Sequence, residues 1–201
     1  MRVIQMLQES EVRRRVRDAY SAAAVHPDKK HAFPVGRQFA ESVGYPADLL
    51  ANLPATCVEG FTGVSNVSMF AEIPRGSAVL DLGCGAGLDA LIAANRTGRE
   101  GGVVGVDFSE AMLARARRSA AEAGLSNAMF CRADAEQLPL RDESVGVVLV
   151  NGIFNLNIAR QSIFRELGRV VQRGGVVYAA ELILKQQLPA EQQASESNWF
   201  A

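Results

Sequence analysis

The sequence has few of the residues that form disulfides or bind metals. It contains three cysteines, Cys57, Cys84 and Cys131, and two histidines in 201 residues, and it has no Cys-x-x-Cys pair. An odd number of widely spaced cysteines does not form a disulfide framework, and scattered thiols do not make a structural metal site. We therefore expect reduced thiols, a cytoplasmic protein and no bound metal.

Long apolar runs and an excess of one charge are also missing. No stretch approaches the roughly 20 apolar residues that cross a bilayer, and the first residues lack the hydrophobic run of a signal peptide. The formal net charge is −1. The basic cluster formed by Arg13, Arg14, Arg15 and Arg17 is best interpreted as the solvated face of a helix. We expect no membrane span and no nucleic-acid partner.

A glycine-rich stretch is the most informative feature of the sequence. Residues 79–88 read Val-Leu-Asp-Leu-Gly-Cys-Gly-Ala-Gly-Leu, an apolar run followed by glycines at alternate positions and then by helical periodicity. This order predicts a strand, a tight loop and the start of a helix. Glycines allow a positive φ and the close approach of a ligand, so the pattern indicates a molecule bound against the main chain.

Two kinds of ligand are compatible with such a loop. A nicotinamide or flavin dinucleotide requires Gly-x-Gly-x-x-Gly, and Leu88 occupies the third glycine position counted from Gly83. Asp81 precedes the first glycine by two residues, where a carboxylate suits an amine-bearing or cationic ligand and repels a phosphate. A dinucleotide-dependent oxidoreductase is therefore the weaker alternative.

Two further aspartates follow predicted strands. Asp107 ends the apolar segment 102–106, and Asp134 follows the segment 127–131. An acidic residue about twenty positions after the glycine loop can accept both hydroxyls of a ribose. Taken singly, each aspartate is more often a helix cap or a turn former. Three of them at successive strand ends favour a single adenosyl ligand.

The Asp-x-Gly-x-Gly-x-Gly run resembles motif I of class I S-adenosylmethionine-dependent methyltransferases. Residues 33–37, 44–46 and 61–66 also resemble the stretch ahead of motif I in the arsenite methyltransferase-like and UbiE-like branch. The resemblance implies S-adenosyl-L-methionine as the cofactor, with Asp134 at the adenine amino group. The expected cofactor-binding residues are Asp81, Gly83, Cys84, Gly85, Gly87, Asp107, Phe108, Met112, Asp134, Ala135 and Asn151.

The predicted fold is α/β, a doubly wound, mostly parallel Rossmann-like sheet of order 3-2-1-4-5. Residues 1–74 are expected to form a helical cap, with helices at about 9–24, 36–43, 46–51 and 64–72. Residues 75–201 are expected to form the cofactor-binding core. Within this core the sequence predicts a helix capped by Ser109, a turn-rich connection from 135 onward, a fourth strand at 145–150, a helix that ends at Arg173-Gly174-Gly175, a fifth strand at 176–184 and a polar helix after Pro189. Seven-stranded methyltransferases add a C-terminal hairpin, for which the chain has no sequence. We expect either a fragment of a longer product or a partner subunit, including a second copy, that completes the sheet.

The expected reaction is methyl transfer to a small-molecule acceptor. The candidate acceptor-pocket residues are Tyr20, Phe33, Phe154 and Asn155. Arsenite is disfavoured as the acceptor because Gly152 stands where the arsenite enzymes carry a thiolate. The sequence assigns no catalytic base. The candidates that could lie near the acceptor are His31, Glu59 and Asn155. A catalytically inactive cofactor-binding subunit or regulator remains the alternative.

Overall fold

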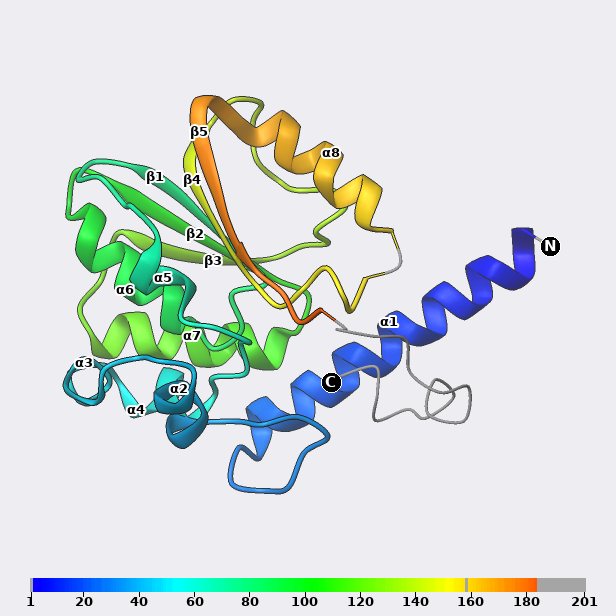
Figure 1. The fold of residues 1–201 in the computed structure, drawn as a ribbon, viewed down its shortest axis with the longest axis horizontal. Helices are drawn as coiled ribbons and strands as arrows, with labels where there is room; N and C mark the ends of the chain where they lie inside the picture. The colour runs from blue at the N-terminus through cyan, green and yellow to red at the C-terminus, as the bar shows by residue number, and fades with distance from the viewer. Residues whose placement is uncertain (1, 158, 184–201) are drawn as a thin grey trace.

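A five-stranded parallel sheet is the centre of the molecule. The structure is a computed structural model that describes residues 2–157 and 159–183. The strands follow the order β3-β2-β1-β4-β5, which confirms the predicted topology (Figure 1). Their bounds are β1 Ala78–Leu82, β2 Gly102–Asp107, β3 Ala128–Arg132, β4 Val145–Asn151 and β5 Val171–Ala180.

Helices cover both faces of this sheet. α6 (Leu88–Thr97) and α7 (Glu110–Glu122) lie on one face, and α8 (Arg160–Val170) lies on the other (Figure 1). Successive strand residues point to opposite faces, so Val79 packs in a core with Ala90 of α6, whereas Leu80 packs in a core with Ile163 of α8. Both faces are therefore buried, as the nearly continuous apolar composition of the inner strands requires.

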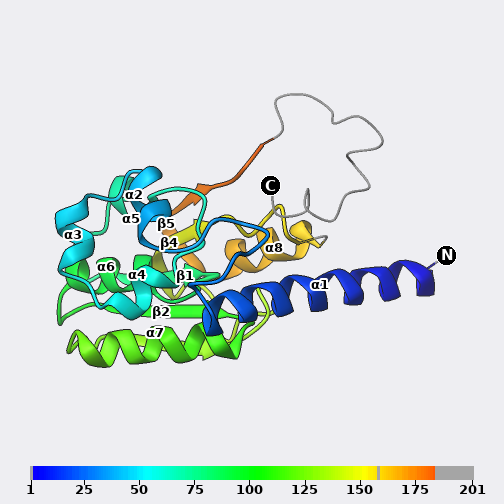
Figure 2. The ribbon, with the colours of Figure 1, turned by 90° about the horizontal axis from the view of Figure 1, so that it is seen from below.

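The first 74 residues form a helix near each predicted position and one more helix, although the first begins at Arg2 and was predicted to begin at about residue 9. Their bounds are α1 Arg2–Val25, α2 Arg37–Ser42, α3 Ala47–Ala51, α4 Ala55–Glu59 and α5 Val67–Phe70. The short helix α4 was not predicted, because one turn after Pro54 is too short to show periodicity. α1 runs along the molecule and extends beyond it (Figure 2). Among the described residues, no helix is long and apolar enough to span a membrane.

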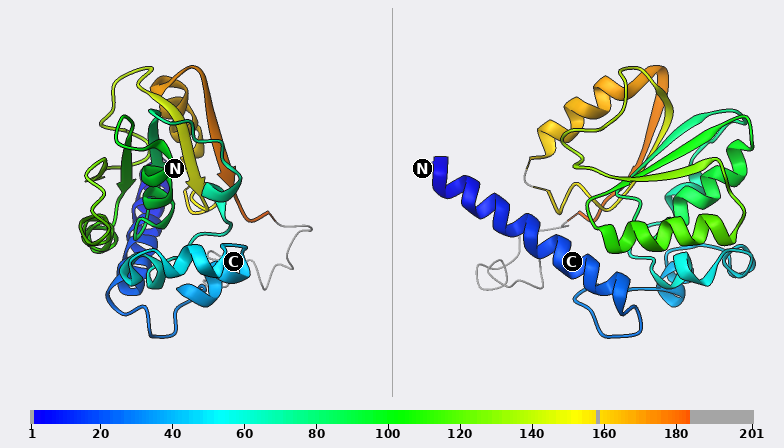
Figure 3. Two further views of the ribbon diagram at one scale, coloured as in Figure 1. Left: turned by 90° about the vertical axis from the view of Figure 1, so that its left-hand side faces the viewer. Right: turned by 180° about the vertical axis from the view of Figure 1, so that it is seen from behind.

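The boundary between α8 and β5 differs from the sequence prediction. The predicted helix ended at Arg173-Gly174-Gly175 and the strand covered 176–184, whereas α8 ends at Val170 and β5 begins at Val171. The strand pairing explains the error, because the partner of β4 shifts from Val171 to Val176 through an irregularity. Gly174 and Gly175 therefore lie within this irregular stretch of β5 and do not end α8. β5 lies at the edge of the sheet (Figure 3). The predicted polar helix after Pro189 lies outside the described residues.

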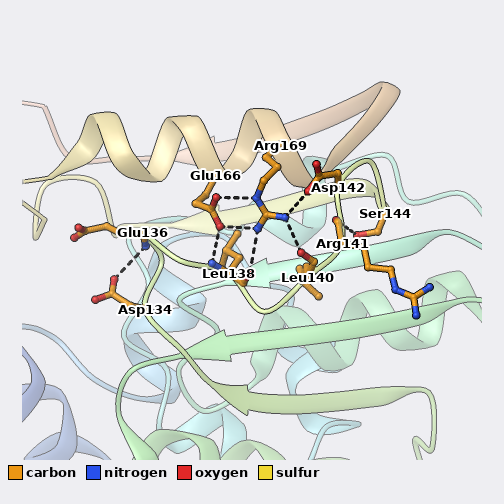
Figure 4. A network of polar contacts seen from close by, with 9 residues as sticks. All are labelled: Asp134, Glu136, Leu138, Leu140, Arg141, Asp142, Ser144, Glu166 and Arg169. Atoms are coloured by element: carbon orange, nitrogen blue, oxygen red, sulfur yellow. Dashed lines mark hydrogen bonds and ion pairs between the residues drawn. The ribbon is translucent and has the colours of Figure 1, made fainter.

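The connection between β3 and β4 contains no helix, as its turn-rich sequence predicted. Arg169 of α8 holds this connection in place (Figure 4). Its guanidinium donates to the carbonyl oxygens of Leu138 and Leu140 at 3.0 and 2.7 Å and pairs with Asp142 at 2.8 Å and Glu166 at 2.6 Å. Arg169 thus ties this connection, which has no helix of its own, to α8.

Candidate functional site

The glycine loop joins β1 to α6 at the carboxyl edge of the sheet. The backbone N–H groups of Gly83 and Cys84 donate to the carbonyl oxygen of Val106 at 2.8 and 3.0 Å, which ties the loop to β2. Gly83 has φ +75°, and a Cβ atom there would lie 2.3 Å from the Ile153 side chain. Glycine is therefore required on both conformational and steric grounds.

A cavity opens beside this loop, between the ends of β1, β2 and β4. The chain reverses its direction of winding between β1 and β4, and this switch point is where open α/β sheets bind their ligands. The structure brings most of the predicted residues to the cavity wall. The predicted residues that line it are Tyr20, Asp81, Gly83, Cys84, Gly85, Asp107, Phe108, Asp134, Ala135 and Asn151.

Two predicted cofactor residues, Gly87 and Met112, do not line the cavity. Gly87 has φ +90° and packs against Ala116 of α7, where a Cβ atom would lie 3.0 Å from the Ala116 side chain. Met112 is fully buried in the first turn of α7, and its backbone N–H bonds the Ser109 cap. Both residues position helices around the site and do not face the cavity.

Three of the four predicted acceptor-pocket residues also lie outside the cavity wall. Phe33 is buried and stacks on Tyr20 with ring centroids 4.5 Å apart, so it supports the ring that does line the cavity. Phe154 stacks on Phe164 at 4.8 Å. Asn155 is exposed, and its side chain donates to the carbonyl oxygen of Leu182. Of these four residues, Tyr20 alone lines the cavity wall.

Asp81 is the most unusual group in the cavity wall. The residue is 2% exposed, and its Oδ2 atom has no hydrogen-bond partner among the described residues. Burial, and then the neighbouring charges of Asp89 and Asp107, raise the pKa of Asp81 well above its ordinary value. An unpaired buried acceptor is costly, so a ligand that donates a hydrogen bond or carries positive charge would relieve it.

Asp107 lies at the end of β2 and organises two neighbouring segments. Its Oδ2 atom accepts from the backbone N–H of Gly85 at 2.9 Å, and its Oδ1 atom accepts from that of Ser109 at 2.8 Å. Burial raises its pKa to about 6, against the opposing effect of these hydrogen bonds. Each carboxylate oxygen keeps a second lone pair, so both can still accept from ligand hydroxyls.

Asp134 is paired across the cavity with the long helix α1. Arg13 donates to Asp134 at 2.9 Å and also contacts Glu136, while the Glu136 backbone N–H donates to Asp134 at 3.1 Å. Arg13, Val16 and Tyr20 all line the cavity, so α1 forms one wall. These contacts hold the α1 wall against the loop after β3.

Several wall residues were not among the predicted site residues. They come from α1, from the segment 60–63 of the cap, from α6 and from the loop after β4; examples are Arg13, Thr62, Asp89 and Leu156. The only signal in the sequence for the segment 61–66 was its resemblance to the stretch ahead of motif I in the arsenite methyltransferase-like branch. The others carry no sequence pattern, because the tertiary fold alone brings them to the cavity.

The thiols are poorly suited to bind a soft metal. Cys57 and Cys84 line the cavity, but burial raises the pKa of Cys57 to about 11 and raises that of Cys84 as well. Both are therefore protonated at neutral pH. Among the described residues, no three His, Cys, Asp or Glu side chains are grouped to hold a metal ion.

The base candidates from the sequence do not reach the cavity. His31 bonds the carbonyl oxygen of His26 at 2.8 Å, and Glu59 faces Arg115 at 3.5 Å. Neither of them lines the cavity wall.

The fold and the site together define a class of protein. A doubly wound sheet, a glycine cradle and buried carboxylates at adjacent strand ends make a nucleoside-binding domain that favours a ligand rich in donors and positive charge. The chain matches the family model described as "Methyltransferase domain" over residues 73–200. The chain belongs to this methyltransferase family, and the resemblance to the S-adenosylmethionine-dependent enzymes is confirmed.

Individual relatives agree with this assignment. The chain is 36% identical over 154 residues to an arsenite methyltransferase of Halobacterium salinarum, covering 77% of this chain and 39% of the relative. It is 36% identical over 105 residues to a demethylmenaquinone methyltransferase of Listeria monocytogenes, covering 52% and 44%. The crystal structure of an arsenic (III) S-adenosylmethionine methyltransferase from Chlamydomonas reinhardtii has a TM-score of 0.62 at 27% identity, covering 81% of this chain and 56% of that one. The chain thus spans about two fifths of the length of these curated relatives.

Proposed function

We propose that this chain binds S-adenosyl-L-methionine in the cavity and transfers its methyl group to a small-molecule acceptor. The main support is Asp81, a buried carboxylate oxygen with no protein partner at a wall made of glycine main chain. An ammonium or sulfonium group satisfies such an oxygen, whereas a phosphate would be repelled. Asp107 would accept the ribose hydroxyls, and Asp134 the adenine amino group.

The residues of the chain contribute positioning, electrostatics and exclusion of water. When bound, the cofactor supplies an electrophilic methyl group, so the protein mainly needs to align an acceptor with it. Asp81 and Asp107 stabilise positive charge and ribose hydroxyls, and α1 covers the site through Val16 and Tyr20. No proton transfer is assigned, because the wall carboxylates Asp81 and Asp107 are assigned to the cofactor and the candidate bases His31 and Glu59 lie outside the cavity wall.

The acceptor is best proposed as a small, largely apolar molecule of the quinol or phenol kind. Val16, Tyr20, Ile153 and Leu156 supply an apolar wall. The thiols disfavour arsenite, because trivalent arsenic requires converging thiolates and these thiols have raised pKa values. A demethylmenaquinone methyltransferase among the relatives is consistent with this acceptor class.

Calorimetric titration with S-adenosylhomocysteine tests the cofactor assignment. We expect the wild-type chain to bind and Asp107→Asn to bind at least about 10-fold more weakly, since a charge-assisted hydrogen bond is lost. Asp48→Asn is the matched control, because Asp48 is an exposed aspartate in α3 that lies outside the cavity wall. Equal affinity of the Asp107→Asn variant and the wild type would contradict the proposed site.

Methyl transfer itself requires a separate assay. Radiolabelled cofactor is offered with a panel of acceptors that includes a quinol, a simple phenol, a thiol and arsenite. We expect label in the quinol or phenol, and none in arsenite. Binding without transfer to any member of the panel would instead support the cofactor-binding, inactive alternative.

A further inference from the structure

Thr62 projects into the cavity from the cap, opposite the glycine loop. It follows Phe61, which is buried in the core of the cap, and it lines the cavity wall. Its Oγ1 atom lies 4.0 Å from the position that a Cβ atom of Gly85 would take. Within the part of the chain that the structure describes, the Thr62 hydroxyl makes no hydrogen bond. A partly buried hydroxyl is thus available on the side of the cavity that faces Gly85.

Asn151, at the end of β4, fixes the segment that carries Thr62. Its Oδ1 atom accepts from the backbone N–H groups of Val64 at 2.8 Å and Ser65 at 3.0 Å. Its Nδ2 atom donates to the carbonyl oxygen of Ser65 at 2.7 Å and to Asp89 Oδ2 at 2.9 Å. Two lone pairs and two N–H bonds are the full capacity of a carboxamide, so Asn151 has none left for a ligand.

The groups around Asn151 make this clamp rigid. A Cβ atom at Gly63 would lie 2.5 Å from the Asn151 side chain, so the segment passes in direct contact with it. Asp89 is 5% exposed and also accepts from the Tyr45 hydroxyl and from the backbone N–H of Ser68. Since Asp89 lies in the first turn of α6, the clamp joins the cap, β4 and the helix that follows the glycine loop.

We propose that Thr62 binds the amino-acid carboxylate of the cofactor and that Asn151 is the residue that positions it. The inference rests on the proposed function, and it gives Asn151 a positioning role in place of the expected direct contact with the cofactor. A carboxylate needs hydrogen-bond donors, whereas Asp81 and Asp107 offer acceptors. The backbone N–H of Gly85 is already bonded to Asp107. The Thr62 hydroxyl supplies a donor at the place where the wall otherwise carries negative charge.

Substitution of Thr62 tests the contact. Thr62→Val keeps the shape and removes the hydroxyl, so the Kd for S-adenosylhomocysteine should rise about 10-fold in calorimetry, as for a lost hydrogen bond to a charged group. Thr62→Ser keeps the hydroxyl and should stay within about threefold of the wild type. 5′-Methylthioadenosine lacks the amino-acid end, so Thr62→Val should bind it as the wild type does.

A double-mutant cycle tests the positioning role of Asn151. Asn151→Ala should weaken S-adenosylhomocysteine binding about 10-fold or more, and adding Thr62→Val should cause no further loss beyond about twofold. Asn127→Ala is the matched control. The Asn127 Nδ2 atom donates to the carbonyl oxygens of Ala94 and Gly98 at 2.9 Å each, but the residue lies outside the cavity wall. Circular dichroism and thermal melting establish that each variant is folded.

The outcomes separate this inference from the proposed function. A wild-type chain that does not bind S-adenosylhomocysteine would overturn both. Wild-type binding that Thr62→Val leaves unchanged would overturn the Thr62 contact alone, and so would an equal loss for 5′-methylthioadenosine. Additive losses in the cycle would overturn the positioning role of Asn151. Loss in Thr62→Val, rescue in Thr62→Ser and non-additivity with Asn151→Ala together support the inference.

Discussion

Asp81 and Asp107 are neighbours on adjacent strands, but their surroundings differ. Asp107 has a backbone N–H donor on each oxygen, whereas Asp81 keeps one oxygen unpaired. Asp107 therefore helps to shape the cavity, by holding the Gly85 loop and the start of α7. Asp81 instead contributes a buried oxygen that no described residue satisfies.

The raised pKa of Asp107 makes cofactor affinity dependent on pH. Its pKa of about 6 exceeds the ordinary value of 3.8, so the folded, empty protein gains stability from this group as the pH falls through 6 toward 3.8. Ligand hydroxyls donate hydrogen bonds to the ionised Asp107 carboxylate. The affinity for S-adenosylhomocysteine therefore falls as the pH falls. We expect the Kd for S-adenosylhomocysteine to rise about tenfold per pH unit below 6.

The control for this pH dependence is Asp107→Asn. The variant should bind weakly throughout and lose the part of the pH dependence that Asp107 causes, while Asp81, whose pKa is also raised, continues to act in the same direction. Titrations between pH 8 and 5 measure the effect. A wild-type Kd that is constant over this range would contradict the assignment.

At the residue scale, the sequence predicted the groups attached to the glycine loop and the strand ends. Asp81, Gly83, Gly85 and Asp107 line the cavity because motif spacing and strand position are local properties. Phe154 and Asn155 were misplaced because the direction of a loop side chain depends on tertiary neighbours. Sequence alone could not show this.

At the level of elements, the arginine network of α8 stabilises a connection with no secondary structure of its own. The same connection carries Asp134 at its start, so its position affects the adenine end of the cavity. Pairing with Arg169, together with the backbone N–H of Leu138, lowers the pKa of Glu166 to about 2. The Glu166 carboxylate is therefore ionised at neutral pH and pairs with Arg169 as an anion.

Removal of this network should affect stability and binding together. Arg169→Gln is expected to lower the urea concentration at which the protein unfolds, because several partly exposed polar contacts are lost, and to weaken S-adenosylhomocysteine binding modestly. Urea denaturation and calorimetry measure the two effects. Arg141→Gln is the matched control, because Arg141 is exposed in the same connection and its side chain points away from the network (Figure 4).

If Arg169→Gln unfolds at the same urea concentration as Arg141→Gln, the network does not stabilise the connection.

Element order was predictable because the inner strands are predominantly apolar and the segments that form α6, α7 and α8 have helical periodicity. The sequence also predicted the cap of α7, where the Ser109 hydroxyl accepts from the backbone N–H of Met112. The start of β5 was not predictable, because glycines that end a helix and glycines that form a bulge look alike in sequence. Only the pairing with β4 distinguishes them.

For the whole molecule, the cap and the sheet share one hydrophobic core. Tyr45, Leu50 and Phe61 of the cap pack in a single cluster with Leu88 and Leu91 of α6. The boundary between a cap of residues 1–74 and a core of residues 75–201 is therefore proposed to separate two roles, covering the cavity and binding the cofactor. It is not proposed to separate two independently folding units.

A shared core predicts cooperative unfolding. We expect the fluorescence of a tryptophan introduced at Phe39, a cap residue packed against this cluster, to change at the same urea concentration as the far-ultraviolet circular dichroism of the sheet and helices. Matching thermal melts of the wild type and the variant serve as the control. Two separated transitions would show that the cap unfolds on its own.

The main-chain walls of the cavity also limit how the site could be engineered. A side chain at Gly60, Gly63 or Gly83 would place its Cβ atom 2.6, 2.5 or 2.3 Å from a neighbouring side chain. Saturation libraries at these glycines would therefore yield mostly damaged proteins. Variation aimed at a new substrate range belongs instead at Tyr20, Leu156 and Asn157, where side chains already border the open space.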